Sequence, residues 1–339
     1  MRYLRAICVV LMGMVFVGYT QAATDAREQV NRLSEEAALL AQSQQSAGIA
    51  LADEIWNLAE LGYLEFQSSA ALQNYLRDNG FQVDSDVGGI PTAFVASYRF
   101  NGADDADPVI AILAEFDALP GLNQAATPFR SVSKEGGSGH ACGHHLFGAA
   151  SSTAAVAVSQ WLLANNVQAT IKLVGTPAEE GGSGKVYLAR AGVFDGVDVV
   201  LHWHPGDGNS ASPSSTTSNK SGRFTFTGRA AHAASAPDRG RSALDGVEAM
   251  NYMVNLMREH VPQTARMHYV ITDGGDAPNI VPETAQVYYY VRHPERDQVV
   301  ELFDRVVRAA EAAAMGTDTQ VDVEVMHGNY PVLPNHTLA

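Results

Sequence analysis

The segment VIAILAEFDALPG, residues 109–121, decides the fold of this 339-residue chain. It opens with five consecutive apolar residues, which is typical of a strand buried on both faces of a parallel sheet. The carboxylates Glu115 and Asp117 follow directly, before a Pro-Gly pair at residues 120–121. In open α/β sheets, ligands bind outside the carboxyl ends of the strands. The segment therefore predicts a buried strand that delivers acidic side chains to a site.

Strand and helix candidates alternate on both sides of this segment. Apolar residues at helical spacing predict helices within residues 25–80. The elements expected next are strands at 92–98 and 108–113, a helix at 147–165, a strand at 170–174, a helix at 185–191 and a strand at 197–203. Strands that alternate with helices imply an α/β fold whose mostly parallel sheet is covered on both faces.

A polar, Ser/Thr-rich stretch at residues 208–221 predicts a loop, and the order of elements changes after it. The elements expected there are strand 222–227, helix 242–260, strands 267–272 and 285–292, helix 295–315 and strand 320–326. The order β-α-β-β-α-β is that of a ferredoxin-like unit. Ser242 is expected to cap the first of these helices. We therefore predict a second, α+β domain at residues 219–328.

The first 22 residues have the three-part pattern of a secretory signal peptide. Arg2 and Arg5 precede an apolar run at residues 7–17, and small residues lead to an expected cleavage site after Ala22. A membrane anchor is the alternative, but the run is shorter than the roughly 20 residues that span a bilayer. We expect removal of residues 1–22, export to the periplasm or beyond, and no other stretch able to cross a membrane.

The charge balance excludes one large class of function. The chain holds 22 Lys and Arg against 37 Asp and Glu, a net charge of −15. Phosphate binding needs a basic face, so we expect no nucleic-acid partner. Loss of Arg2, Arg5 and Cys8 with the leader would leave 20 basic residues, a net charge of −17 and one cysteine. That cysteine, Cys142, then has no disulfide partner within the chain.

Possible metal ligands follow three of the expected strands. The segments that carry them are GHACGHH at 139–145, TPAEEGG at 176–182 and HWHP at 202–205. Together they offer thiolate, imidazole and carboxylate donors, the mixture that suits zinc and related divalent ions. Because Pro205 interrupts the strand after His202 and His204, we expect only one of these two histidines to be a ligand.

Each of these groups also has a purely structural interpretation. A lone cysteine such as Cys142 is more often a small buried hydrophobe, although three neighbouring histidines in a Gly-rich loop argue against packing alone. The pair Glu179 and Glu180 would ordinarily be solvated, but it lies between a proline and three glycines. Adjacent carboxylates of this kind can divide labour, one binding metal while the other takes a proton from water.

Taken together, the segments AEFDALPG, GHACGHH, PAEEGGSGK and WHP, with AAHAA and GRSALD in the second domain, resemble the metal-dependent amidohydrolase and aminoacylase branch of the M20 peptidases. The resemblance implies a zinc-exopeptidase-like catalytic domain at residues 23–218 and an inserted ferredoxin-like lid and dimerisation domain at 219–328. Residues 329–339 would begin the return to the catalytic domain. The family continues from there to a final histidine ligand, so we expect this chain to lack that ligand and to be weakly active alone.

The resemblance also assigns roles to single residues. It implies two divalent metal ions, zinc or manganese, held by Cys142, His144, Glu180 and His204. Glu179 would be the general base. The side chains whose roles it leaves open are His140, His145 and His202.

Three residues of the lid carry weaker expectations. The resemblance makes His232 a catalytic residue that stabilises the tetrahedral oxyanion, often across a homodimer formed by the lid. Asn279 and Arg292 match positions that hold a substrate carboxylate, a task suited to the bidentate guanidinium. A surface histidine in a turn and a solvated strand-end arginine are the alternatives.

The function implied is hydrolysis of the amide bond in N-acyl or N-aroyl amino acids, of the p-aminobenzoyl-glutamate type. A dipeptidase or carboxypeptidase of the same fold is one alternative, because the same activated water cleaves peptide bonds. A non-catalytic metal-binding or ligand-binding remnant is another. A hydrolase with Cys142 as nucleophile is a remote one, because no activating base is evident beside it.

Overall fold

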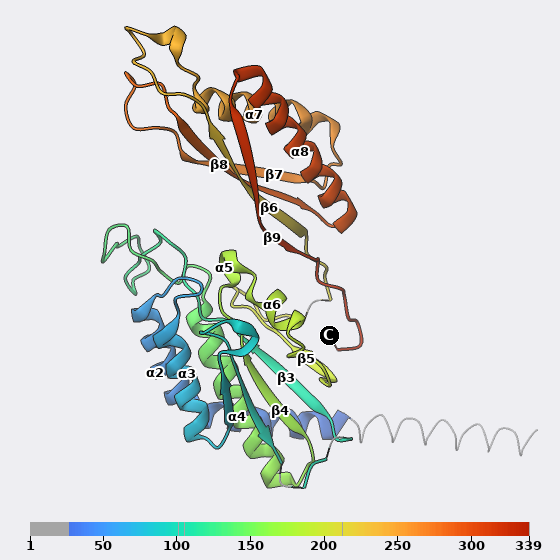
Figure 1. Ribbon diagram of the computed structural model, residues 1–339. Helices are drawn as coiled ribbons and strands as arrows, with labels where there is room; N and C mark the ends of the chain where they lie inside the picture. The colour runs from blue at the N-terminus through green and yellow to red at the C-terminus, as the bar shows by residue number, and fades with distance from the viewer. Residues whose placement is uncertain (1–26, 101, 105, 212, 339) are drawn as a thin grey trace, which may run out of the picture. The chain divides into compact units, whose positions relative to one another are not determined.

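The computed structural model describes residues 27–100, 102–104, 106–211 and 213–338 (Figure 1). The expected signal peptide, residues 1–22, lies outside the described residues. The described chain forms two compact units. The first contains the residues up to Glu180 together with Tyr187–Pro205, and the second contains Gly181–Val186 and the residues from Gly206 onward.

The first unit is built on a five-stranded sheet with the strand order β1-β2-β4-β3-β5. Its strands are β1 (Gln82–Ser85), β2 (Phe94–Arg99), β3 (Val109–Ala114), β4 (Thr170–Gly175) and β5 (Val199–Leu201). β3 pairs in parallel with β4 and β5, whereas β2 runs antiparallel to both β4 and β1. The mainly parallel α/β sheet is confirmed. β1 was not expected, because its sequence QVDS is too short and polar to give a periodic signal.

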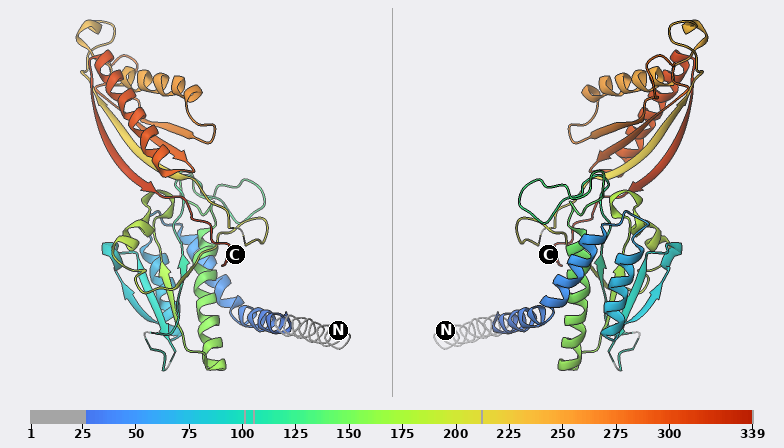
Figure 2. Two further views of the ribbon diagram at one scale, coloured as in Figure 1. Left: turned by 90° about the vertical axis from the view of Figure 1, so that its right-hand side faces the viewer. Right: turned by 90° about the vertical axis from the view of Figure 1, so that its left-hand side faces the viewer.

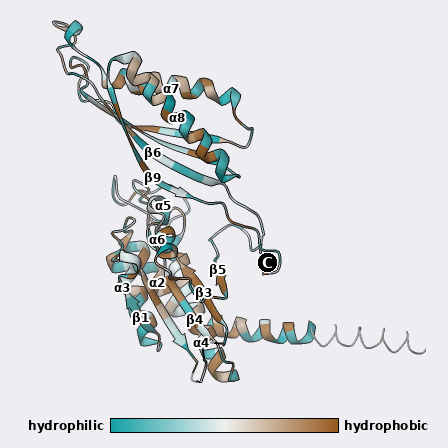
Figure 3. Cartoon of the chain, turned by 45° about the vertical axis from the view of Figure 1, so that its right-hand side comes forward, coloured by the Kyte–Doolittle hydropathy of each residue, from teal (hydrophilic) through white to brown (hydrophobic). Residues whose placement is uncertain are grey.

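Helices cover both faces of this sheet, as expected. After a helical stretch at residues 27–43, the helices are α2 (Gln45–Leu58), α3 (Phe66–Asp78), α4 (His144–Asn165), α5 (Glu179–Gly182) and α6 (Gly184–Arg190). Residues of α2, α3 and α4 share one core with Ala114 of β3, and Leu188 of α6 packs with Ala111 and Leu113 on the other face. β3 is therefore buried on both faces, and Figure 3 shows β3 and β4 as hydrophobic strands.

One expectation about membranes was wrong. Among the described residues, α4 is long and apolar enough to cross a bilayer by length and composition alone. However, 61% of that stretch is buried inside the fold. α4 is apolar because it packs against α2, α3 and two strands at once, so its hydropathy reflects a core position.

The second unit contains a four-stranded antiparallel sheet with the order β7-β8-β6-β9. Its elements are β6 (Ser218–Thr227), α7 (Ala243–Met257), β7 (Arg266–Asp273), β8 (Thr284–His293), α8 (Arg296–Thr317) and β9 (Gln320–Asn329). This order along the chain is the expected ferredoxin-like one, and both helices lie on the same face of the sheet (Figure 2). Ser242 accepts a hydrogen bond from the backbone N–H of Asp245, so the predicted cap is confirmed.

β6 begins earlier than the sequence suggested. The polar residues 218–221, assigned to a loop, pair with β8 and β9 instead. Asn219 lies opposite Arg292 of β8 and Asn329 of β9. The helix-free face of the sheet carries polar side chains, which is why this strand start lacks the apolar alternation of a half-buried strand.

Candidate metal centre

The predicted ligand-bearing segments meet at the carboxyl edge of the first sheet. Glu115 and Asp117 follow β3, the turn before Glu179 follows β4, and His204 follows β5. Cys142 and His144 come from the loop and first residue of α4, which packs so closely that a Cβ on Gly148 would lie 2.8 Å from the Glu115 carbonyl oxygen. The sequence thus brings both faces of the site together through one tightly packed helix.

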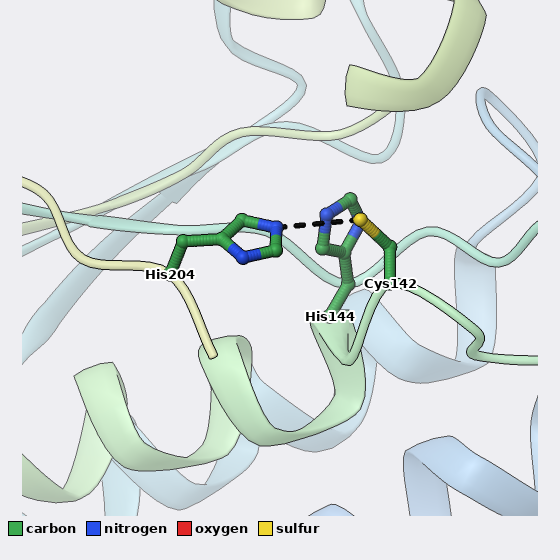
Figure 4. A group of neighbouring side chains, drawn as sticks. All are labelled: Cys142, His144 and His204. Carbon is green, nitrogen blue, oxygen red and sulfur yellow. Dashed lines mark hydrogen bonds between the residues drawn. The ribbon is translucent and has the colours of Figure 1, made fainter. Parts of the chain in front are cut away.

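Cys142, His144 and His204 form a compact group of donor atoms (Figure 4). These atoms lie within 4.8 Å of one another, and Cys142 Sγ is 3.3 Å from His204 Nε2. His204 Nδ1 donates to the Pro205 carbonyl at 2.9 Å, which leaves Nε2 with its lone pair. One thiol and two imidazoles are the donor set of many zinc sites.

His144 is completely buried between two carboxylates. Its Nδ1 lies 2.8 Å from Asp117 Oδ1, and its Nε2 lies 3.0 Å from Glu115 Oε2. Burial lowers the pKa of His144, but the hydrogen bonds to Asp117 and Glu115 outweigh it and raise that pKa to about 10. A carboxylate at Nδ1 is the arrangement that orients a metal-binding histidine with Nε2 toward the ion.

A second group of donor atoms shares the same histidine. Glu115, His144 and Glu179 also place one donor atom each within 4.8 Å of the others. Glu180 is in neither group found among the described residues, although its side chain hydrogen-bonds Cys142 and its Oε1 lies 4.0 Å from His144 Nδ1. The structure therefore gathers all four predicted ligands, while the division of roles between Glu179 and Glu180 stays a prediction.

The surroundings of Cys142 are strongly acidic. Burial raises the pKa of its thiol to about 12, aided by the negative charges of Glu180, Glu179 and Glu115. A thiol with such a pKa is protonated at neutral pH, which argues against Cys142 as a nucleophile. A divalent cation beside the same thiol would reverse this effect, because metal binding deprotonates its ligands. The donor set and its excess negative charge fit a divalent cation.

The histidines left open lie around this centre. His140 Nε2 donates to the Ile55 carbonyl at 3.0 Å, and its ring lies 5.1 Å from that of His145. Burial lowers the pKa of both, to about 4 for His145, so both are neutral at pH 7. His145 also packs edge-on against Trp56, as a structural residue would. His202 Nε2 lies 3.2 Å from Glu115 Oε1, a contact the sequence did not suggest.

Residues 111–339 match Peptidase family M20/M25/M40. The chain belongs to this family. It is 43% identical over 290 residues to a p-aminobenzoyl-glutamate hydrolase of Escherichia coli K12, covering 85% of this chain and 59% of that protein's length. It is 31% identical over 335 residues to the mouse Xaa-Arg dipeptidase, covering 96% of this chain and 74% of that protein.

Solved structures show the same fold at low identity. The aminobenzoyl-glutamate utilization protein of Klebsiella pneumoniae superposes with a TM-score of 0.65 at 19% identity, covering 88% of this chain and 79% of that one. Bacillus subtilis YxeP, described as a dinuclear metal-binding peptidase of the M20 family, gives 0.58 at 21%, covering 87% and 77%. The M20 fold is thereby shown for both units of the chain.

The three predicted lid residues belong to the second unit, and the structure brings only two of them together. The Ala233 backbone N–H donates to the Asn279 carbonyl at 3.0 Å, so His232 and Asn279 lie on neighbouring segments. Arg292, by contrast, is near the far end of β8, whose first residue follows Asn279 by a few positions. Its guanidinium stacks 5.3 Å from the ring centre of Tyr290. Within one chain, Asn279 and Arg292 are therefore separated by most of a strand.

Proposed function

We propose that this M20 protein hydrolyses the amide bond of N-acyl or N-aroyl amino acids, with p-aminobenzoyl-glutamate as the representative substrate. The observation that carries the proposal is the convergence of Cys142, His144 and His204 beside the acidic pair that follows β4. The similarity to the Escherichia coli p-aminobenzoyl-glutamate hydrolase supports the aroyl-glutamate class. The whole protein's substrate remains part of this proposal, because the chain spans 59% of that relative's length.

The chain's own donors would hold two divalent ions, zinc or manganese. Cys142, His144 and His204 supply one group, and Glu180 and the second donor group adjoin it. When bound, such ions polarise a carbonyl group and lower the pKa of water toward about 7. Asp117 keeps His144 oriented for this task, because its Oδ1 accepts the Nδ1 proton at 2.8 Å.

Glu179 would act as the general base. It is exposed at the first turn after β4, so water and substrate can reach its carboxylate. Its donor atom lies within 4.8 Å of those of Glu115 and His144, which places it beside the proposed ions. Glu179 would take a proton from water and later pass one to the leaving amine.

The lid residues would bind and stabilise the substrate. His232 Nδ1 accepts hydrogen bonds from the backbone N–H groups of Ala234 and Ser235, both at 3.2 Å. Its proton is therefore on Nε2, where it could donate to the oxyanion. We propose that Asn279 and Arg292 hold the substrate carboxylate. Their separation along β8 supports a homodimer, in which the two residues would come from different protomers.

A peptidase activity is the second candidate, and the likeness to a Xaa-Arg dipeptidase favours it. Export, the other untested expectation, remains a proposal from the N-terminal pattern. Rates on p-aminobenzoyl-glutamate and on a set of dipeptides, measured on the zinc- or manganese-loaded chain, distinguish the two activities. We expect faster release of p-aminobenzoate. Preferential cleavage of dipeptides would reject the aroyl-glutamate assignment.

Glu179→Gln tests the proposed mechanism in the same assay. The amide cannot take a proton, so turnover should fall by at least about a hundredfold, the contribution typical of general base catalysis. Metal content should stay at the wild-type level, because the ligands are intact. A near-normal rate would reject Glu179 as the base, and a loss of metal would make it a ligand instead.

A further inference from the structure

Glu65 is a buried carboxyl that the proposed mechanism does not use. It ends the connection between α2 and α3, residues 59–65, which we call the brace, and its side chain is completely buried. Burying a carboxyl away from water is costly unless its oxygens are hydrogen-bonded. Its contacts therefore indicate what the buried group does.

Both Glu65 oxygens have defined partners. Oε1 accepts the backbone N–H of Ala178 at 2.7 Å, and Oε2 accepts the Thr92 hydroxyl at 3.0 Å. Thr92 lies just before β2, so Glu65 joins the α2–α3 connection to the strand beside β4. Ala178 is itself buried, which leaves water little access to its N–H group.

Ala178 has a backbone conformation that alanine seldom adopts. Its φ angle is +56°, in the left-handed region that costs energy for residues with a Cβ. This residue stands directly before Glu179 and Glu180, so its conformation sets the direction in which both carboxylates leave β4. Strained backbone of this kind persists only where surrounding contacts hold it. The Glu65 hydrogen bond is such a contact.

Two further contacts tie the brace to the site. The Ala118 backbone N–H donates to the Glu60 carbonyl at 2.8 Å, next to Asp117. Gly62 approaches Ala178 so closely that a Cβ at position 62 would lie 3.0 Å from both its Cα and Cβ. The brace therefore contacts the segment after β3 and the segment after β4, which carry the acidic residues of the centre.

We propose that Glu65 is a positioning residue whose buried carboxyl holds the Ala178 turn and so fixes Glu179 and Glu180 at the metal centre. The inference rests on the proposed metal-dependent function, because it assigns Glu65 a task only in arranging those two carboxylates. A purely structural Glu65 would affect folding stability alone. A positioning Glu65 affects metal affinity and turnover in chains that remain folded.

Zinc and manganese titration of variants tests this role. Glu65→Ala should weaken the binding of ZnCl2 or MnCl2, measured by calorimetry, by about 10- to 100-fold, the range seen when groups that orient metal ligands are removed. It should also lower kcat with little change in KM, because the substrate contacts are elsewhere. Glu65→Gln keeps an acceptor oxygen for the Ala178 N–H and should restore most of both properties.

Glu60→Ala is the matched control. Glu60 belongs to the same brace, but its carboxylate accepts the N–H of Gln67 at 3.1 Å and of Ser68 at 2.8 Å, at the start of α3. It should lower the unfolding midpoint and leave metal affinity at the wild-type value. Wild-type metal affinity in folded Glu65→Ala, or an equal loss in Glu60→Ala, would overturn the proposal.

Two provisions keep the test decisive. If Glu65→Ala does not fold, Thr92→Val removes one partner of the carboxyl and should give a smaller loss of metal affinity, whereas unchanged affinity would reject the positioning role. If the wild-type chain binds metal but hydrolyses no amide, the proposed activity fails, while the titrations still decide the role of Glu65.

Discussion

Asp117 joins two parts of the metal centre through its two carboxylate oxygens. Oδ1 lies 2.8 Å from His144 Nδ1, and Oδ2 accepts the Glu180 backbone N–H at 2.9 Å. Both of these partners present N–H groups, which a carboxylate accepts and an amide can accept through only one atom. Asp117 is itself buried, so water cannot replace a lost bond.

Asp117→Asn should therefore weaken metal binding. The new amide must lose one of the two bonds or face an N–H group with another, and we expect zinc affinity to fall about 10- to 100-fold in calorimetric titration. Asp198→Asn is the control, because Asp198 accepts the Val109 N–H at 2.8 Å, at the other end of β3. Equal affinities for wild type and Asp117→Asn would show that Asp117 does not orient the ligands.

The buried Glu65 predicts a specific dependence of stability on pH. Burial raises the pKa of Glu65 from 4.5 to about 7, so the folded chain binds this proton more tightly than the unfolded chain. Its contribution to stability is full below pH 4.5 and is lost as the pH rises through 7. A glutamine at this position has no such proton to lose.

The comparison is between wild type and Glu65→Gln. Between pH 4.5 and 8, the free energy of unfolding of the variant should gain about 3 kcal/mol relative to wild type, the equivalent of the raised pKa of Glu65. Urea denaturation at a series of pH values measures it. A difference between the two proteins that does not change with pH would contradict the buried, proton-binding state of Glu65.

At the level of elements, the contact between α4 and β3 positions the centre. A Cβ on Gly148 would meet the Glu115 carbonyl oxygen at 2.8 Å and Leu72 Cδ1 at 3.2 Å. Gly148→Ala should therefore destabilise the fold by about 1–3 kcal/mol, as overpacking does, although alanine is ordinarily the better helix former. Gly316→Ala in α8, where nothing lies within 4 Å, should be neutral or stabilising. Equal effects in thermal denaturation would refute this tight contact.

Elements with a strong periodic signal could be predicted from sequence. β3 is a continuous apolar run because both its faces are buried, and α7 and α8 carry one apolar stripe each. β1 and the start of β6 could not be predicted, because both are polar and are defined by pairing with distant strands. Local sequence patterns do not encode such partners.

The same distinction holds for the site. Cys142, His144 and His204 could be identified because thiol and imidazole groups that cluster after the strands of a parallel sheet are typical of metal sites. Glu65 could not, because nothing in its neighbourhood ELGYLE shows that this carboxyl is buried. The distance between Asn279 and Arg292 was also hidden, since it depends on β8 running its full length between them.

At the scale of the molecule, the proposed homodimer has a candidate surface. β7 is an edge strand of its sheet, and Tyr269, Val270 and Ile271 on it are exposed. An exposed apolar edge strand can pair with another chain. We expect twice the monomer mass in sedimentation equilibrium, and the monomer mass after Val270→Lys combined with Ile271→Lys.

Met315→Lys is the control for the added charge. Met315 is an exposed apolar residue near the end of α8, which is not part of the β7 edge. This variant should remain dimeric. A wild-type chain that sediments as a monomer at high concentration would remove the proposed shared site of Asn279 and Arg292.

The release of p-aminobenzoate from p-aminobenzoyl-glutamate, before and after chelation, tests metal-dependent amide hydrolysis most directly. The zinc- or manganese-loaded chain should release p-aminobenzoate, lose that activity when a chelator removes the ion, and regain it when the ion is returned. Cys142→Ala should show little release under any of these conditions. Release that is insensitive to the chelator, or no release from any loaded form of the wild-type chain, would contradict the assignment.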